Sequence, residues 1–343
     1  MLEVAEADHL AAARAGDQQA FSRLAEPYRR ELQVHCYRIL GSLHDAEDMV
    51  QETMLRAWRR LDTFEGRASF RAWLYKIATH ACLDALDKRQ RRTLPALAYP
   101  AADPRAPVGP TIAGAVHSWL EPYPDELLPE TGPSPEAHFE AHESITLAFL
   151  AALQALPPRQ RAALILRDAL GWPASETADI LELTVPAVKS ALHRARATLA
   201  KHYHAGGLAG ARAAPADEAM RALLDRFVHA WETADVAGLI ALLKADAVLS
   251  MPPIPAWYRG RESVGLFIAS AILTGDAGGR WHLRPTRANS QPAFAVYERD
   301  DAGFYRAYGL QVLTFDGNQL AEMTIFVDPE WVPRFGLPAE IKA

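Results

Sequence analysis

The sequence predicts a multidomain protein in which two all-α domains, the second ending in a helix-turn-helix, precede an α+β domain. Three observations predict this fold class. Helical periodicity runs through two separate blocks of the chain, a proline-rich stretch divides them, and strand-like runs with a hairpin signal occur only near the C-terminus. We expect a first helical block (1–92), a linker (93–135), a second helical block (136–203), a flexible joint (204–217) and a C-terminal domain (218–343).

Length and charge limit the classes of function. At 343 residues the chain is long enough for two or three domains. Its formal net charge of -6 excludes a protein coated with nucleic-acid-binding surface, so DNA affinity must come from local basic patches. No membrane-spanning apolar run or signal-peptide pattern occurs, so we expect a cytoplasmic protein without membrane association. Cys36 and Cys82 lie within apolar helical patterns and read as core thiols.

In the first helical block, Ser42 and Asp45 have the spacing of a capping box, so a helix is predicted to begin at Leu43. Its inward side carries Ala46, Val50, Thr53, Ala57 and Leu61. An acidic stripe lies on nearly the opposite side and consists of Asp45, Asp48 and Glu52, with Glu47 and Gln51 beside them. Such a stripe is either a solvated face or a partner surface, and the pattern alone leaves both readings open.

A loop at Phe64–Ser69 and a helix at Phe70–Arg92 follow. The helix carries Trp73 and Tyr75 early, and it ends with the cations Lys88, Arg89, Arg91 and Arg92. Aromatic rings accept unstacked bases and cations hold phosphates, which suits single-stranded or melted DNA. The alternative is that Trp73 is a core residue and that the cations complement the helix dipole. We favour the core for Trp73 and DNA for the loop and the basic end.

The linker between the helical blocks contains ten prolines, yet it also holds an apolar island at His117–Glu130. A pure spacer has no need of the side chains there, which include Trp119, Leu120, Tyr123, Leu127 and Leu128. We name residues 119–124 the WLEPYP island. It is predicted either to dock on another part of the assembly or to form a local cluster that covers a domain.

The second helical block ends in a helix-turn-helix. A short helix carries Ala178, Ile180 and Leu181, a turn covers Glu182–Thr184, and Pro186 lies in the first turn of the next helix. That helix turns Val188, Leu192, Ala195 and Leu199 inward and leaves Lys189, His193, Arg194 and Arg196 facing out. This is typical of a recognition helix in a DNA major groove, although a basic solvated helix in a small bundle would show the same pattern.

These motifs resemble a known family. The segments Gly41–Arg92, with DAEDMVQETMLRAW and SFRAWLYKIA, and Leu156–Leu199 are similar to the second and fourth conserved regions of bacterial sigma factors of the extracytoplasmic-function group. The resemblance implies that the chain binds RNA polymerase core and directs initiation at promoters. It also implies that the linker threads through polymerase near the RNA exit path.

The same resemblance assigns roles to side chains. The surface that docks on the clamp helices of the largest polymerase subunit would comprise Asp45, Glu47, Asp48, Gln51 and Glu52. The −10 element would be opened and read by Arg67, Ser69, Trp73, Lys76, His80, Lys88, Arg89, Arg91 and Arg92. The −35 element would be read by Lys189, Ser190, His193, Arg194 and Arg196.

Three positions depart from the family's usual pattern. Glu182 stands where a turn glycine is common, and a left-handed backbone there would cost roughly 1 kcal/mol. Ala191 replaces a frequent arginine, which removes a DNA contact. His80 stands where asparagine is common.

The C-terminal domain mixes helices and strands. Helices are predicted from about Glu218, at Val236–Leu243 and at Arg261–Leu273. Strands are predicted at Ala247–Met251, Trp281–Ala288, Ala293–Arg299, Phe304–Phe315 and Leu320–Val327, with a hairpin turn at Asp316-Gly317-Asn318. This order, with the MPPIPAWYRGRESV and FDGNQLAEMTIFVDPEWVPRFGLP segments, resembles the cone-shaped SnoaL-like (nuclear-transport-factor-2-like) fold, in which a curved antiparallel sheet follows the helices.

Such cones enclose an apolar pocket suited to a small ligand. The candidates for its wall, for each of which core packing is the alternative, are Trp257, Tyr258, His282, Tyr297, Tyr308 and Gln311. His282 and Glu298 could serve as bases, but no acid–base constellation emerges, so we expect no catalysis, no cofactor and no metal.

Three hypotheses follow. The first is a sigma factor whose C-terminal domain regulates it in cis, by packing on the helical domains or the WLEPYP island. The second is a bifunctional sigma factor whose C-terminal domain binds or transforms a small apolar ligand. The third is a repressor that binds DNA alone. The acidic helix and the aromatic −10 helix count against the third, because a repressor uses neither.

Overall fold

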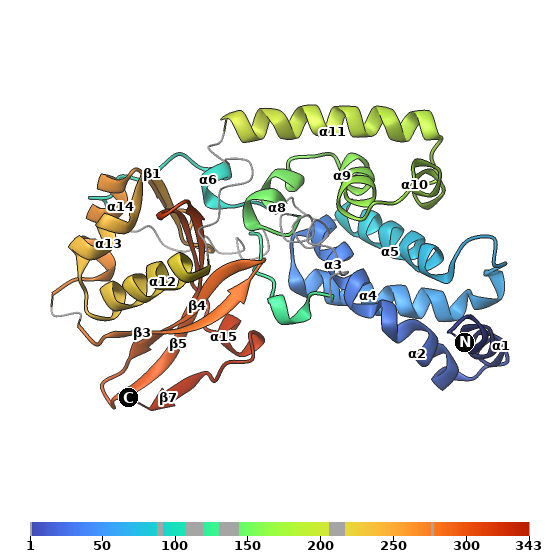
Figure 1. The fold of residues 1–343 in the computed structure, drawn as a ribbon, viewed down its shortest axis with the longest axis horizontal. Coiled ribbons are helices and arrows are strands. Elements are labelled where there is room, and N and C mark those ends of the chain that lie inside the picture. The colour runs from blue at the N-terminus through green and yellow to red at the C-terminus, as the bar shows by residue number, and fades with distance from the viewer. Residues whose placement is uncertain are drawn as a thin grey trace. The chain divides into compact units, whose positions relative to one another are not determined.

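The computed structural model describes residues 2–87, 92–107, 119–129, 144–205, 217–275 and 278–342. The chain packs as two compact units. Residues 1–92 and 127–207 form a helical unit, and residues 93–126 and 208–343 form a C-terminal unit (Figure 1). Most of the linker therefore packs with the C-terminal domain, whereas the two helical blocks share one body.

The first half of the helical unit contains α1 (Leu2–Arg14), α2 (Gln18–Ala25), α3 (Arg29–Leu40), α4 (Leu43–Arg59) and α5 (Phe70–Leu86). The Ser42 hydroxyl accepts a hydrogen bond from the Asp45 amide at 3.0 Å, which confirms the predicted helix start. The predicted inward side of α4 is buried throughout. Helix α5 ends at Leu86, earlier than the predicted Arg92.

The second half contains α8 (Leu147–Gln154), α9 (Pro158–Leu164), a π-helical turn η5 (Ile165–Ala169), α10 (Ala174–Leu181) and α11 (Val185–Ala205). The turn between α10 and α11 falls at residues 182–184, so the predicted helix-turn-helix is confirmed. The predicted inward residues of α11 are buried. The predicted resumption of helix near Pro135 lies outside the described residues.

Buried polar contacts join the two halves. The Arg161 side chain, 3 % exposed, donates hydrogen bonds to the carbonyl oxygens of Ile39 and Leu156. The Arg38 guanidinium donates to the Ser144 hydroxyl at 2.6 Å. Helices α3 and α5 lie between α4 and the helices of the second half (Figure 1). Two blocks that are distant in sequence thus share one core.

The C-terminal unit contains a seven-stranded mixed sheet. Its strands are β1 (Leu243–Ser250), β2 (Trp257–Arg259), β3 (Trp281–Ala288), β4 (Gln291–Arg299), β5 (Phe304–Asp316), β6 (Gln319–Phe326) and β7 (Glu340–Lys342). The strand order is β2-β1-β6-β5-β4-β3, with β7 on β5. The sheet is mixed because β1 runs parallel to β6, whereas the other pairs of strands are antiparallel as predicted.

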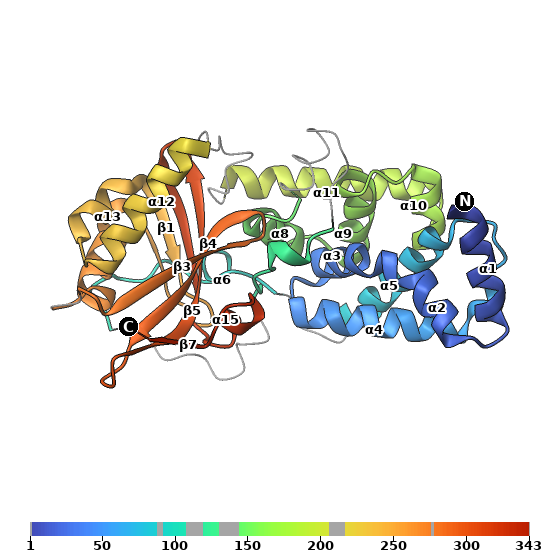
Figure 2. The same cartoon turned by 60° about the horizontal axis from the view of Figure 1, so that its bottom comes forward.

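Helices cover one face of this sheet. They are α12 (Asp217–Glu232), α13 (Val236–Leu242) and α14 (Arg261–Phe267), which continues as a π-helical turn η6 (Ile268–Ile272) (Figure 2). The main core lies between them and the sheet and includes Phe227, Trp231 and Leu313. On the other face, α15 (Trp331–Arg334) brings Val332 against Ala295 and Tyr297.

The predicted fold class is confirmed in its architecture: two helical blocks, the second with a helix-turn-helix, precede an α+β domain. The Asp316-Gly317-Asn318 turn joins β5 to β6 as predicted. Cys36 and Cys82 are buried free thiols. Sequence reasoning missed β2, β7 and α15, each of three or four residues. Within the described ranges, no helix has both the length and the apolar character needed to cross a membrane.

Candidate functional site

The predicted polymerase-binding stripe on α4 is only partly exposed. Asp45 is 6 % exposed, and its carboxylate accepts a hydrogen bond from Arg92 Nη2 at 2.7 Å. Arg92, at 7 % exposure, is buried with it. These are two corrections: Asp45 does not lie on the exposed stripe, and Arg92 is not presented to DNA. The physical reason is that each charge compensates the other in a buried site.

The rest of the stripe remains accessible. Glu47, Asp48 and Glu52 are half-buried, and Gln51 is exposed. Glu52 accepts a hydrogen bond from the Arg56 guanidinium at 2.7 Å. Leu55, 42 % exposed, lies four residues after Gln51 and therefore on the same side of the helix. Sequence reasoning missed this apolar residue, although its i+4 spacing from Gln51 could have identified it.

The predicted −10 residues fall into two groups, the first of which lies around the start of α5. Arg67 is exposed and pairs with Glu65. The Ser69 hydroxyl caps α5 by accepting from the Ala72 amide at 3.1 Å. Trp73 is half-buried, with its ring centroid 5.2 Å from that of Phe64, so it is both packed and accessible. Lys88, Arg89 and Arg91 lie outside the described residues.

The second group contacts the helix-turn-helix. Lys76 Nζ lies 2.9 Å from the Glu182 carboxylate, and His80 Nε2 lies 3.0 Å from the Ile180 carbonyl oxygen. The Lys76 ammonium lowers the pKa of Glu182. The backbone of Glu182 is left-handed, with φ 54°, as expected for a position where glycine is common.

Aromatic packing lies beside this contact. The ring of Trp172, in the loop before α10, is 5.2 Å from that of Tyr75. The Arg71 guanidinium lies 4.8 Å from the centroid of Trp172. Tyr75 is fully buried and Trp172 is 5 % exposed. The face of α5 that bears Lys76 and His80 is therefore covered by the second helical block.

The predicted −35 surface on α11 is open. Lys189, Ser190, His193 and Arg194 are exposed. Arg196 is also exposed, but its guanidinium makes two hydrogen bonds to Asp168, at 2.9 and 2.7 Å. Ala191 is only 5 % exposed. The interpretation that Ala191 removes a DNA contact stays a prediction.

The six pocket candidates of the C-terminal domain do not come together. Tyr258 lies in the main core, stacked on Phe267 with ring centroids 4.0 Å apart. Tyr297 lies on the α15 face. The candidates also include Tyr308, which packs on Trp281, and Trp257, whose indole donates to the Tyr99 carbonyl in the linker at 2.8 Å.

The two remaining candidates differ in their environment. Gln311 is fully buried between Phe294 and Ile325 of the neighbouring strands, and its amide has no hydrogen-bond partner among the described residues. His282 is half-buried, with Nδ1 2.8 Å from the Glu232 carboxylate.

The two potential bases are also separated. Glu298 faces Trp281 in the sheet register, and His282 faces Tyr297, so Glu298 and His282 lie on opposite faces of the sheet. Glu298 pairs with Arg280 at 2.6 Å. The two side chains therefore cannot act as an acid–base pair on one substrate.

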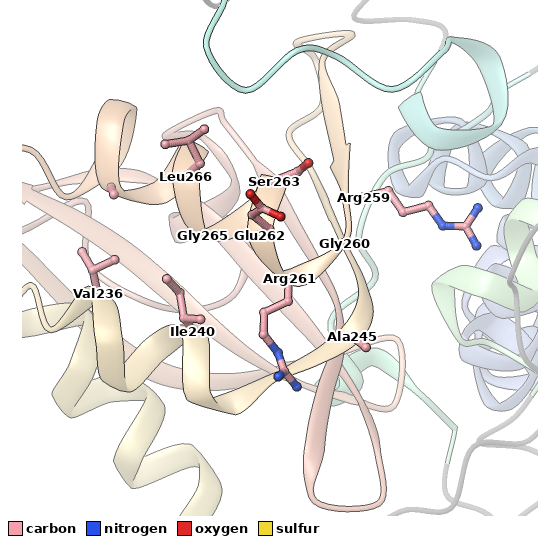
Figure 3. A pocket seen from close by; sticks show the side chains of 11 residues that line it. Val236, Ile240, Ala245, Arg259, Gly260, Arg261, Glu262, Ser263, Gly265 and Leu266 are labelled. Atoms are coloured by element: carbon pink, nitrogen blue, oxygen red, sulfur yellow. The ribbon is translucent and has the colours of Figure 1, made fainter.

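An open groove of about 870 Å³ lies instead between α13 and α14 (Figure 3). Val236, Ile240 and Leu266 form apolar parts of its wall, with Arg261 and Glu262 beside them. The Arg261 guanidinium donates to the Leu243 carbonyl at 2.6 Å. None of the six predicted pocket residues lines this groove.

The linker is attached to the C-terminal domain at two places. At the first, the Ala102 amide donates to the Trp257 carbonyl of β2 at 2.8 Å, beside the Trp257–Tyr99 bond. At the second, the WLEPYP island meets the turn between β3 and β4. The Tyr123 amide donates to Asn289 Oδ1 at 2.9 Å, and the Asn289 amide donates to the Tyr123 carbonyl at 2.9 Å.

Asp125 extends the second attachment. Its carboxylate accepts from the Ser290 amide at 2.7 Å and from the Arg287 guanidinium at 3.0 Å. Within the island, Trp119, Leu120 and Tyr123 are all buried, at 4 %, 1 % and 0 % exposure. The island thus packs on the C-terminal domain within the same compact unit, an arrangement compatible with both predictions for it.

Comparison with known proteins places the two helical blocks in a family. Residues 24–92 match the model of Sigma-70 region 2, and residues 146–199 match that of Sigma-70 region 4. The chain is 42% identical over 327 residues to the ECF RNA polymerase sigma factor SigG of Mycobacterium tuberculosis, which covers 95% of this chain and 85% of that protein. It is 30% identical over 186 residues to SigW of Bacillus subtilis, covering 54% of this chain and 90% of that protein.

Among solved structures, the fold is similar to that of the extracytoplasmic function sigma factor SigJ of Mycobacterium tuberculosis. The TM-score is 0.57 at 22% identity, and the match covers 91% of this chain and 97% of that one. The similarity therefore extends over the C-terminal unit as well as over the helical unit.

Proposed function

Since this chain belongs to the ECF sigma factors of RNA polymerase, we propose that its C-terminal domain regulates it in cis by holding the linker between the two helical blocks. The chain binds RNA polymerase core and directs initiation at promoters, and this principal function is not catalytic. We place its action in the cytoplasm, where RNA polymerase works.

We further propose which surfaces serve initiation. Glu47, Asp48, Gln51 and Glu52 on α4 contact the clamp helices of polymerase, and Leu55 supplies an apolar contact among them. Arg67, Trp73, Lys76 and His80 read the −10 element, and the exposed cations of α11 read the −35 element. The accessible residues of α4 and α11 support the polymerase and −35 roles, and the exposed Arg67 and the half-buried Trp73 support the −10 role.

The observation that carries the regulatory proposal is the attachment of the WLEPYP island to the β3–β4 turn. The linker is the covalent connection between the two promoter-reading blocks, so fixing it restricts how far they can separate. The attachment includes four hydrogen bonds at Tyr123 and Asp125, and Tyr123 is fully buried. This is the contact expected of a domain that controls the span of the linker.

The test is run-off transcription with purified core polymerase on fragmented genomic DNA, read by sequencing the transcript 5′ ends. We compare the full chain, a truncation after Ala205 and the full-length variant Asp125→Ala. We expect transcript yield, core affinity or both to change in the same direction for the truncation and the variant. Unchanged yield and unchanged core affinity in both would refute regulation through this contact.

A second candidate function is ligand binding by the C-terminal domain, favoured by the unpaired amide of Gln311. If the amide has no partner, Gln311→Leu should stabilise the protein by about 1–3 kcal/mol, because it removes a buried polar group that makes no bond. If a small ligand binds it, native mass spectrometry of the purified protein should show added mass that Gln311→Leu abolishes. A stabilised variant with no added mass on the wild type would exclude the ligand.

A further inference from the structure

Two side chains of α5 contact the helix-turn-helix. Lys76 and His80 both contact residues at the C-terminal end of α10: the Lys76 ammonium pairs with Glu182 at 2.9 Å, and the His80 ring bonds the Ile180 carbonyl at 3.0 Å. Ile180 and Glu182 are two residues apart, so these contacts form one patch. Both contacts lie within the helical unit.

Both side chains are engaged by the second helical block while they make these bonds. The Lys76 ammonium is neutralised by a carboxylate, and the His80 nitrogen that points out from α5 is engaged by a backbone carbonyl. The neighbouring ring of Tyr75 is fully buried against Trp172. The second helical block therefore covers part of the α5 surface that an incoming base would approach.

Glu182 is the unusual member of this patch. Its φ of 54° lies in the left-handed region, which is unfavourable for a residue with a Cβ and is normally occupied by glycine after a helix. Its side chain is 61% exposed, so core packing does not explain why glutamate stands there. The contact that its side chain makes within the described structure is the ion pair with Lys76.

We propose that Glu182 is a latch that closes the second helical block over α5 and masks Lys76 and His80 until the protein opens. This inference rests on the proposed role of Lys76 and His80 in reading the −10 element. It concerns a different contact from the linker attachment, because every latch residue lies in the helical unit. Breaking the latch favours the open form, in which α5 is free to bind unpaired DNA.

The size of the effect follows from exposure. The Lys76 side chain is 41% exposed and that of Glu182 is 61% exposed, so the pair is a surface pair. Such pairs contribute at most about 1 kcal/mol, which corresponds to a shift of about fivefold in the closed-to-open ratio. The left-handed turn persists in both forms, so its strain does not enter this ratio.

The first test reads the closed form directly. A carbodiimide joins a lysine amine to a carboxylate only where the two are in contact, so the full-length protein should yield a peptide with Lys76 linked to Glu182. Glu182→Lys should abolish that link. The double variant Lys76→Glu/Glu182→Lys should restore a link between the same two positions. Absence of the wild-type link, or no restoration in the exchanged pair, would overturn the latch.

The second test measures whether the latch limits binding of single-stranded DNA. A fluorescent pool of random single-stranded 20-mers should bind Glu182→Gln up to about fivefold more tightly than wild type. The matched control is Glu176→Gln, because Glu176 is an exposed carboxylate in the first turn of α10, the helix that Glu182 follows. It removes the same charge and leaves the pair intact.

The results of the two tests distinguish the latch from a general effect of charge. Equal gains in Glu182→Gln and Glu176→Gln would show a general charge effect and would overturn the latch. A wild-type cross-link without any gain in Glu182→Gln would overturn the masking. Thermal melts of both variants check that each is folded. The cross-link does not depend on linker regulation, so failure of the proposed regulation in cis leaves this test interpretable.

Discussion

The attachment of the linker to the C-terminal domain can be weakened by removing one hydrogen-bond acceptor. Asn289 opens the β3–β4 turn with φ 57°, and its Oδ1 accepts the Tyr123 amide at 2.9 Å. Asn289→Gly removes that acceptor but keeps a residue that adopts positive φ without strain, so the hairpin should remain intact. The backbone amide of residue 289 still donates to the Tyr123 carbonyl.

The expected magnitude follows from burial. Tyr123 and Asn289 are both fully buried, so the Tyr123 amide loses its partner without direct access to solvent. An unpaired buried donor costs about 1–3 kcal/mol, which weakens the attachment by about 5- to 150-fold. Entry of a water molecule into the space left by the side chain would put the effect at the lower end of this range.

Hydrogen exchange measured by mass spectrometry checks this value. We expect the Tyr123 amide to exchange faster by the factor given above in Asn289→Gly, while the peptides of the helical unit keep their rates. Ser290→Gly is the matched control, because Ser290 also has positive φ, at 59°, and contributes to the linker contact only its backbone amide. Equal acceleration in both variants, or none in Asn289→Gly, would refute the reasoning.

Three further predictions concern the helical unit. Burial lowers the pKa of His35 to about 3, so the folded state stays neutral while the unfolded state takes up a proton below about pH 6.5. The contribution of His35 to the free energy of unfolding is therefore fully present above pH 6.5 and falls as the pH drops towards 3. In urea denaturation, the decrease in the free energy of unfolding between pH 7 and pH 5 should be about 2 kcal/mol larger in wild type than in His35→Gln. Asp45→Asn should cost about 3–5 kcal/mol in the same assay, since it removes the carboxylate that pairs with the buried Arg92, and Asp45→Leu/Arg92→Met should recover most of that loss. Lys189→Ala should reduce the salt dependence of duplex binding by about one released ion in fluorescence anisotropy. Arg196→Ala should reduce it by less, because Asp168 already neutralises that guanidinium.

Local patterns predicted the helices well because their information is local. The Ser42 cap and the i, i+4 spacing of Ala46 and Val50 lie within one short segment, and the structure places the start of α4 and its buried side as predicted. The same holds for α11. Strands β2 and β7 were missed because three residues are too few to show an alternation.

Contacts between distant segments could not be predicted from local sequence patterns. Asp45 and Arg92 are 47 residues apart, and their burial as a pair removes one member from each of two predicted surfaces. Spacing on α4 places Asp45 beside Asp48, but it contains no information about the residue that follows α5. The island illustrates the same limit: its apolar content predicted docking, whereas its partner, Asn289, lies 166 residues further along the chain.

Non-glycine residues with positive φ take part in two of the contacts between distant segments. Four non-glycine residues in the described structure have positive φ: Glu182, Ala234, Asn289 and Ser290. The side chain of Glu182 reaches Lys76 on another helix, and that of Asn289 reaches Tyr123 in the linker. At both positions glycine would relieve the backbone but would remove the contact. An unfavourable backbone state that is retained together with a specific side-chain bond points to a role for that bond. This argument supports the latch at Glu182, whereas asparagine adopts positive φ more readily, so the role of Asn289 rests on its hydrogen bonds with Tyr123.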